Sequence, residues 1–127
     1  MNTKTFKVTA DWFDGAEVVL RVDLDVLTTE LANEINSFWG DADVRLEYEN
    51  DDAIRAVVRL FGAAAIHHAM SDGGASFGPL EPGDNGWTQV VIDAQSEGWP
   101  DAEDLGIQIV AAEVAAAGFD DVSLEAL

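Results

Sequence analysis

Apolar residues recur at every second position near both ends of the chain and at every third or fourth position between them. A period of two is typical of strands with one buried face, whereas a period near 3.6 is typical of helices. Strand and helix patterns do not alternate, so parallel strand–helix–strand units are not expected. The pattern predicts a single α+β domain over residues 1–127, with two β-hairpins forming a mainly antiparallel four-stranded sheet against two or three helices, in the order ββ-α-α-ββ.

The first predicted hairpin lies near the N-terminus. Phe6, Val8 and Ala10 alternate with polar residues and predict one strand, and the run AEVVLRVDLD predicts the next. The pair Asp14-Gly15 between them is typical of a hairpin turn. The buried face of the second strand is expected to consist of Val18, Leu20, Val22 and Leu24.

A second hairpin is predicted near the C-terminus, where the same alternation returns. Ile107, Ile109 and Ala111 form the first half of the pattern, and the motif GFDD indicates a turn. The second half of the pattern consists of Val122, Leu124 and Ala126. We expect both hairpins to pair into one sheet, with the apolar faces of their strands directed toward the helices.

Two helices are predicted between the hairpins, with a short helical turn between them in the stretch DADVRLEYENDD. Thr28 or Thr29 is expected to cap the first helix, and Asn50 or Asp51 the second, which ends near SDGG. The first helix is expected to bury Leu27, Leu31, Ile35, Phe38 and Trp39, and the second Ile54, Val57, Val58, Phe61, Ala65 and His68.

The stretch from Ser71 to Pro100 is rich in Gly, Asp and Pro, and two interpretations of its apolar residues stay open. Their spacing fits one face of a short third helix, whereas the run TQVVI also fits a strand. The residues on the helical face would be Trp87, Val90, Val91 and Ala94.

Charge is the outlying property of the composition. Asp and Glu number 25 against six Lys and Arg, for a formal net charge of −19, and all six basic residues lie before Leu60. Direct binding to nucleic acid is not expected, because it needs Lys and Arg to displace counterions. Anionic membranes are excluded by the same argument. No apolar run has the length of a membrane span or resembles a signal peptide, which favours a cytoplasmic protein.

Candidate metal and cofactor chemistry is weak in this sequence. There is no cysteine, and the adjacent His67 and His68 point about 100° apart on a helix rather than sharing one face. The acidic run at Asp101 has Leu105 and Ala112 where a calcium loop needs acids. The run at Glu47 has Asp52 where the loop needs glycine and Val58 where it needs glutamate. There is no phosphate-binding glycine motif and no nucleophile elbow, so no cofactor, metal or catalytic residue is expected.

Four stretches, WFDGAEVVLRVDLDVLT, EINSFW, AVVRLFG and SEGWPD, occur in this order along the chain. In these stretches the chain resembles a small family of uncharacterised proteins from proteobacterial phages, plasmids and integrated elements. That family carries a domain of unknown function, so the resemblance implies no catalytic residue. It implies an origin in a mobile element, where small acidic proteins often disarm host defence.

The acids themselves are the remaining functional signal. Asp23 and Asp25 would lie about 6.6 Å apart on a strand, and Glu30 and Glu34 about 6 Å apart on a helix. These spacings are close to those between successive phosphates of a nucleic-acid strand. The predicted partner-binding residues are Asp23, Asp25, Glu30, Glu34, Asp41, Asp43, Glu47, Glu49, Asp51 and Asp52.

The function hypothesis is therefore a non-enzymatic inhibitor that mimics DNA on a basic, nucleic-acid-binding host protein, such as a CRISPR or restriction effector. The alternative is an acidic, solvated regulatory or structural domain without mimicry, because charge runs often only keep a protein soluble. An enzyme ranks third. The helix dipole gives Asp51 and Asp52 a structural explanation, whereas Asp43, Glu47 and Glu49 have only Arg45 nearby to offset their repulsion.

Overall fold

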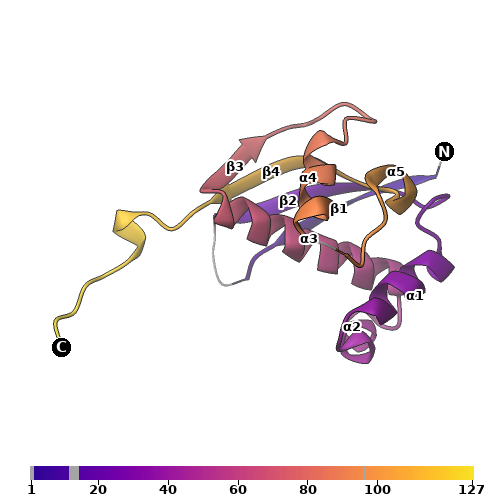
Figure 1. Ribbon diagram of the computed structural model, residues 1–127, viewed down its shortest axis with the longest axis horizontal. Helices are drawn as coiled ribbons and strands as arrows, with labels where there is room; N and C mark the ends of the chain where they lie inside the picture. Colours follow the sequence, from indigo (N-terminus) through magenta and orange to yellow (C-terminus); the bar gives the residue numbers. More distant parts are fainter. Residues whose placement is uncertain (1, 12–14, 96) are drawn as a thin grey trace.

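One antiparallel sheet with helices on its inner face makes up the computed structural model, which describes residues 2–11, 15–95 and 97–127 (Figure 1). The predicted α+β class is confirmed. The strands run in the order β1-β2-β4-β3 and are β1 (Thr3–Thr9), β2 (Ala16–Asp23), β3 (Gly74–Phe77) and β4 (Ile107–Ala115). The helices are α1 (Thr29–Phe38), α2 (Ala42–Tyr48), α3 (Ala53–Ser71), α4 (Gly86–Ala94) and α5 (Ala102–Leu105), followed by a 3-10 turn at Phe119–Asp121.

The predicted first hairpin is confirmed by the pairing of β1 with β2. The two strands are antiparallel, and Phe6 lies opposite Leu20. Along β2 every second residue from Ala16 is buried, as the alternation predicts, whereas Leu24 lies beyond the strand and is half-buried. The predicted turn pair includes Asp14, which lies outside the described residues.

The C-terminal half of the second predicted hairpin is wrong. Ile107 and Ile109 are buried in β4 as expected, but β4 pairs with β2 on one side and with β3 on the other. Residues 122–127 form no strand, and Val122 and Leu124 are 65% and 98% exposed. Alternation gives a segment a preference for the extended state but provides no partner. Both sides of β4 are already paired, so this segment has no place beside it.

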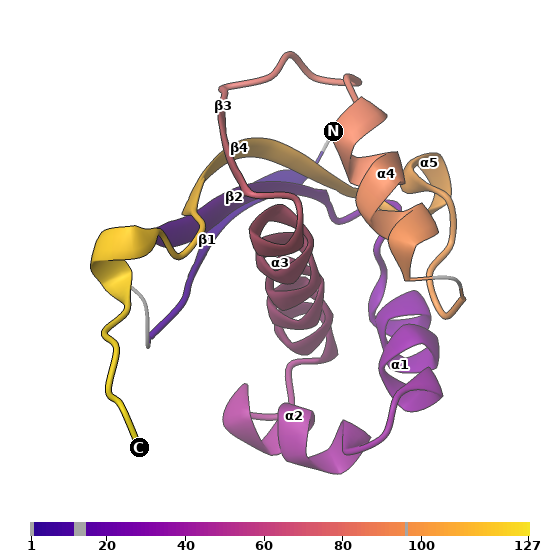
Figure 2. The same cartoon turned by 60° about the vertical axis from the view of Figure 1, so that its left-hand side comes forward.

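Helix α3 lies across the inner face of the sheet, with α1, α4 and α5 to one side of it and α2 below (Figure 2). Val57, Phe61 and Ala65 are fully buried there, whereas the predicted Ile54 and His68 are half-buried. The cap of α3 is Asp52, whose side chain accepts from the backbone N of Arg55, and not Asn50 or Asp51. These two residues adopt positive φ angles in the turn before the helix, so the first extended residue is one position later.

Helix α1 begins as predicted, because the hydroxyl of Thr28 accepts a hydrogen bond from the backbone N of Leu31 at 3.2 Å. Its buried face is rotated from the predicted one. Asn36 is 1% exposed, whereas Phe38 is 52% exposed. A polar residue therefore occupies an interior position that an apolar pattern cannot reveal.

The segment around Trp87–Ala94, for which the sequence allowed either a helix or a strand, forms the helix α4. Its buried residues are Thr88, Val91 and Ile92, whereas Val90 and Ala94 of the predicted face are exposed. The α4 face that packs inward is the one that carries Thr88, beside an irregularity in the β2–β4 pairing next to Ile109. The Thr88 hydroxyl accepts a hydrogen bond from the backbone N of Ile109 at 2.9 Å, which directs this threonine inward.

The outer face of the sheet is only partly covered. Gln108 of β4 is 8% exposed, and its side-chain amide donates to the backbone oxygens of Glu81 and Asp84. Arg21 of β2 donates to the amide oxygen of Gln108 at 3.0 Å. The loop after β3 therefore lies against β4 and leaves the β1 side of this face in solvent. Within the described residues, no helix is both long and apolar enough to cross a bilayer.

Candidate partner-binding surface

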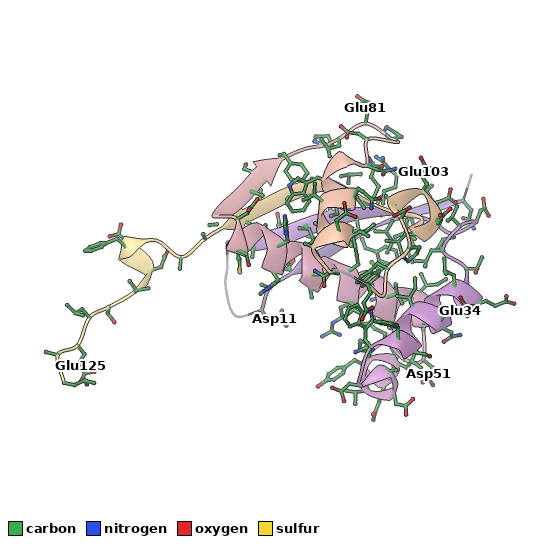
Figure 3. The ribbon with its side chains drawn as sticks, viewed as in Figure 1. Asp11, Glu34, Asp51, Glu81, Glu103 and Glu125 are labelled. Carbon is green, nitrogen blue, oxygen red and sulfur yellow. The ribbon has the colours of Figure 1, made fainter. Side chains whose placement is uncertain are left out.

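Most of the acids predicted to bind a partner lie between the end of β2 and the start of α3, around α1 and α2. Figure 3 shows Glu34 and Asp51 projecting from this region into solvent. We call the exposed members of the predicted set the acidic surface. They are Asp25, Glu30, Glu34, Asp41, Asp43, Glu47, Asp51 and Asp52.

The predicted strand spacing of Asp23 and Asp25 is wrong, because β2 ends at Asp23. The two residues instead form a turn in which the Asp23 carboxylate accepts from the backbone N of Asp25 at 3.0 Å. The backbone oxygen of Asp23 also accepts from Val26 and Leu27. Asp23 thus orders the link from β2 to α1, and Asp25 is the exposed member of the pair.

Glu49 has an internal role that the charge pattern did not reveal. Its carboxylate lies 2.8 Å from Nε of Arg55 and 2.9 Å from Nη1 of Arg59, and its side chain is only 13% exposed. The hydrogen bonds from Arg55 and Arg59 hold the pKa of Glu49 below its usual value. Glu49 therefore joins the end of α2 to α3, and its charge is largely neutralised.

Arg45 forms no ion pair with the neighbouring acids in the described part of the chain, although its sequence position suggested that it offsets their repulsion. Its guanidinium donates to the side-chain and backbone oxygens of Asn36 and to the backbone oxygens of Trp39 and Gly40. The buried Asn36 amide donates in turn to the backbone oxygen of Ala42 at 3.1 Å. These bonds attach α2 to the C-terminal end of α1, where the unpaired carbonyls of a helix favour a cation.

The acidic surface consequently keeps its charge. The described residues form three ion pairs, and these engage only two acids, Glu17 and Glu49. Acids also occur elsewhere on the molecule, and Figure 3 labels Glu81, Glu103 and Glu125 far from α2. Negative charge is thus general to the protein, and the region around α1 and α2 carries the acids predicted to bind a partner.

Basic residues gather on the opposite side of α2, between β1 and α3. Lys4 Nζ and the Arg55 guanidinium carbon lie 5.2 and 5.9 Å from the ring centre of Phe6. The Arg59 guanidinium lies 5.3 Å from the ring centre of Tyr48. Lys7, on β1, is within 3.6 Å of Glu17. The sequence shows only that these residues precede Leu60, and the fold brings them to one edge of the sheet.

The two histidines do not form a ligand set. The His68 ring packs edge-on against Trp87 at 5.7 Å, and its Nε2 is buried without a hydrogen-bond partner among the described residues. His67 is exposed. In the part of the chain that the structure describes, no three His, Asp or Glu residues are placed to hold a metal ion.

Comparisons with known proteins agree with the resemblance seen in the sequence. Residues 17–124 match a family described as a protein of unknown function, DUF2528. Over 121 residues the chain is 28% identical to protein ea10 of Escherichia phage lambda, with 84% of this chain and 97% of that protein covered. The same figures hold for the Lambda prophage-derived protein ea10 of Escherichia coli O6:H1, strain CFT073. No solved structure matches the chain significantly.

Proposed function

The chain belongs to the phage-associated DUF2528 family of unknown function, and we propose that it acts as an acidic protein-binding inhibitor that mimics DNA. Its target would be a basic, nucleic-acid-binding host protein, such as a CRISPR or restriction effector. In this proposal the protein acts by occupying a surface and catalyses no reaction.

The proposal rests mainly on the hydrogen bonds that Arg45 donates. Arg45 donates its four hydrogen bonds to neutral oxygens, and among the described residues Asp41, Asp43 and Glu47 form no ion pair. The same bonds fix α2 against α1. A mimic of DNA needs charges that are both uncompensated and held in place, because flexible side chains lose more entropy when they bind.

The charge of the protein supports the expected kinetics of such an interaction. A surface of one sign attracts a partner of the other sign over several ångströms and raises the association rate. At physiological ionic strength the screening length is about 8 Å, so this attraction weakens as salt increases. An inhibitor of a groove built for DNA would thus compete best at low salt.

A solvated regulatory or structural domain of a mobile element is the second candidate. The acids outside α1 and α2, such as Glu81 and Glu103, favour it, because charge spread over a surface also serves solubility alone. The two candidates differ in whether the position of the acids matters or only their number.

Competition for duplex DNA tests the proposal with a matched control. The targets are purified host CRISPR and restriction effectors bound to fluorescent duplex DNA, and displacement is followed by anisotropy. The test variant carries Asp43→Asn, Glu47→Gln and Asp51→Asn. The control variant has the same net charge and carries Glu81→Gln, Glu103→Gln and Asp104→Asn, all at exposed positions outside α1 and α2.

We expect the wild type and the control to displace DNA from at least one target, and the test variant to do so about tenfold less well at low salt. Equal loss in both variants would favour general acidity over a specific surface. No displacement by the wild type from any target would contradict the proposal.

A further inference from the structure

The C-terminal segment of the chain, residues 117–127, leaves its apolar side chains in solvent. Phe119, Val122 and Leu124 are 92%, 65% and 98% exposed, and Figures 1 and 2 show the segment directed away from the sheet and helices. It carries Asp120, Asp121 and Glu125 and no basic residue. A small domain seldom exposes so much apolar surface in one segment unless that surface binds something.

Strand β1 offers the backbone groups that such a segment could bind. It is an edge strand of the sheet. Ala10 donates to Ala16, and Leu24 donates to Asn2, so the even-numbered residues of β1 form the hydrogen bonds to β2. The N–H and C=O groups of Thr3, Thr5, Lys7 and Thr9 therefore point away from β2, and no other described strand pairs with them.

A groove runs along this edge between β1 and α3. Its β1 wall is formed by Phe6, Val8 and Ala10, whose side chains lie on the inner face of the sheet. Its α3 wall is formed by Val58, Arg59, Ala63, Ile66, His67 and Met70. Figure 2 shows α1, α4 and α5 on the opposite side of α3, so among the described elements they do not cover this groove.

The charges of the groove and of the C-terminal segment are complementary. Four of the six basic residues of the protein lie at the groove, namely Lys4, Lys7, Arg55 and Arg59. Asp11 and Glu49 also line it, and Glu49 is already paired with the two arginines. In a chain of net charge −19, this is the region where a further acidic segment meets the least repulsion.

We propose that the C-terminal segment of a second copy of this chain binds along β1 as an additional strand. Alternate side chains of a strand point to opposite faces, so Val122, Leu124 and Ala126 would enter the groove against α3. Asp121 and Glu125 would then lie on the outer face with Lys7. The added strand supplies main-chain hydrogen bonds, and the alternate side chains supply selectivity, as in other cases of strand addition.

A protective role of the lysines is the simplest competing explanation. Lysine on an edge strand hinders pairing with other chains, and Lys4 and Lys7 are such residues. This explanation accounts for the lysines but leaves the groove and the exposed apolar segment unrelated to each other. Strand addition by an acidic segment accounts for all three, because the same lysines then attract their partner.

Three full-length variants test the proposal by light scattering after size exclusion, at protein concentrations from micromolar to millimolar. The first carries Val122→Ser and Leu124→Ser, which remove apolar contact without a change of charge. The second carries Thr5→Pro, which removes an outward N–H but none of the hydrogen bonds to β2. The control carries Val90→Ser, at a residue of α4 that is 49% exposed and distant from β1.

We expect wild type and control to associate into dimers or longer assemblies, and the first two variants to remain monomeric. A wild type that is monomeric at every concentration overturns the proposal. This holds whether the C-terminal segment then binds the groove of its own molecule, binds another protein or stays free in solvent.

Direct binding keeps the test decisive if Thr5→Pro impairs folding. A labelled peptide of residues 117–127 is added to the full-length Val122→Ser, Leu124→Ser variant, whose groove is intact. We expect saturable binding that is lost when the peptide carries Leu124→Ser or when the protein carries Arg59→Glu. Absence of saturable binding, or binding that ignores both changes, would overturn the proposal.

Discussion

Arg45 of α2 holds Asn36 of α1 through both of its oxygens, with Nε 2.7 Å from the side-chain oxygen and Nη2 2.9 Å from the backbone oxygen. Asn36 is 1% exposed, so this bond pattern lies at the base of the α1–α2 region rather than on its surface. Arg45 is the one basic residue in the acidic stretch of residues 41–52, and it thus serves to position α2. Within the stretch only Glu49 forms ion pairs among the described residues, and the repulsion among the exposed acids is tolerated because α2 is anchored.

The first prediction concerns this anchor. Arg45→Lys should lower the free energy of unfolding by about 1–3 kcal/mol, because an ammonium group cannot reach the four acceptors of a planar guanidinium and leaves buried oxygens unsatisfied. Urea titration measures the loss, and hydrogen exchange should show it first in residues 36–49. Asp43→Asn is the control, an exposed neighbour whose replacement should leave stability equal or slightly higher. A lysine variant as stable as the wild type would contradict the anchor.

The second prediction concerns pH. The hydrogen bonds of Arg55 and Arg59 hold the folded-state pKa of Glu49 below its unfolded value. The stabilisation is therefore fully present above the unfolded-state pKa and is lost as the pH falls through the folded-state pKa. Glu49→Gln should cost about 1 kcal/mol at neutral pH, since both arginines are half exposed, and the difference from wild type should disappear in acid.

Glu47→Gln provides the comparison for Glu49, because its carboxylate is exposed and forms no ion pair among the described residues. Thermal unfolding of both variants between pH 3 and pH 7 measures the effect. A pH-independent loss in Glu49→Gln, or an equal loss in Glu47→Gln, would refute the assigned role.

The third prediction concerns the contact between α3 and β1. Alanine in place of a helical glycine usually stabilises by up to about 1 kcal/mol. At Gly62, however, a Cβ would lie 2.5 Å from Cγ2 and 2.7 Å from Cβ of Val8. Gly62→Ala should thus destabilise by about 1–3 kcal/mol, because β-branched Val8 has little freedom to move away.

The double variant with Val8→Ala distinguishes a clash from a general effect on α3. If the contact with Val8 is the cause, the two changes together should cost less than the sum of their separate costs in chemical denaturation. Strict additivity, or a Gly62→Ala protein more stable than the wild type, would show that β1 accommodates the extra methyl group.

The sequence pattern predicted a strand or helix correctly where that element buries one face along its whole length. The alternation at Val18, Leu20 and Val22 gave β2 with the correct residues inside, and the apolar spacing in α3 gave its core positions Val57 and Phe61. In these elements local preference and tertiary packing favour the same conformation, which is why period alone identifies them.

The pattern failed where an element depends on a distant partner. The segment Gly74–Phe77 has glycine, alanine and serine in place of strong strand formers, yet it pairs with Ala115 through Ala112. Val122 and Leu124 show the opposite case, since they alternate as a strand does but pair with nothing in their own chain. The spacing of apolar residues within a segment does not show whether a distant strand is available to pair with it.

The exposure of most candidate residues agrees with the sequence pattern, whereas the contacts of Arg45 and Glu49 were not predictable from it. Counting acids identified the region around α2, and eight of the ten predicted side chains are exposed there. Arg45 and Glu49 were misjudged because their partners, Asn36 and Arg59, are nine and ten positions away and are brought close only by turns. Helical spacing of three or four residues reveals no such pairs.

The strand order β1-β2-β4-β3 gives the sheet two unequal edges, with seven residues in β1 and four in β3. A short edge strand is a poor template for another strand, whereas a long one is a good template. Pairing at β1 therefore leaves no second edge of similar length on the same molecule. Under the proposed strand addition the sheet would be extended at β1 alone, so the protein would exchange a strand with a neighbour without the continuous stacking of strands that produces amyloid fibrils.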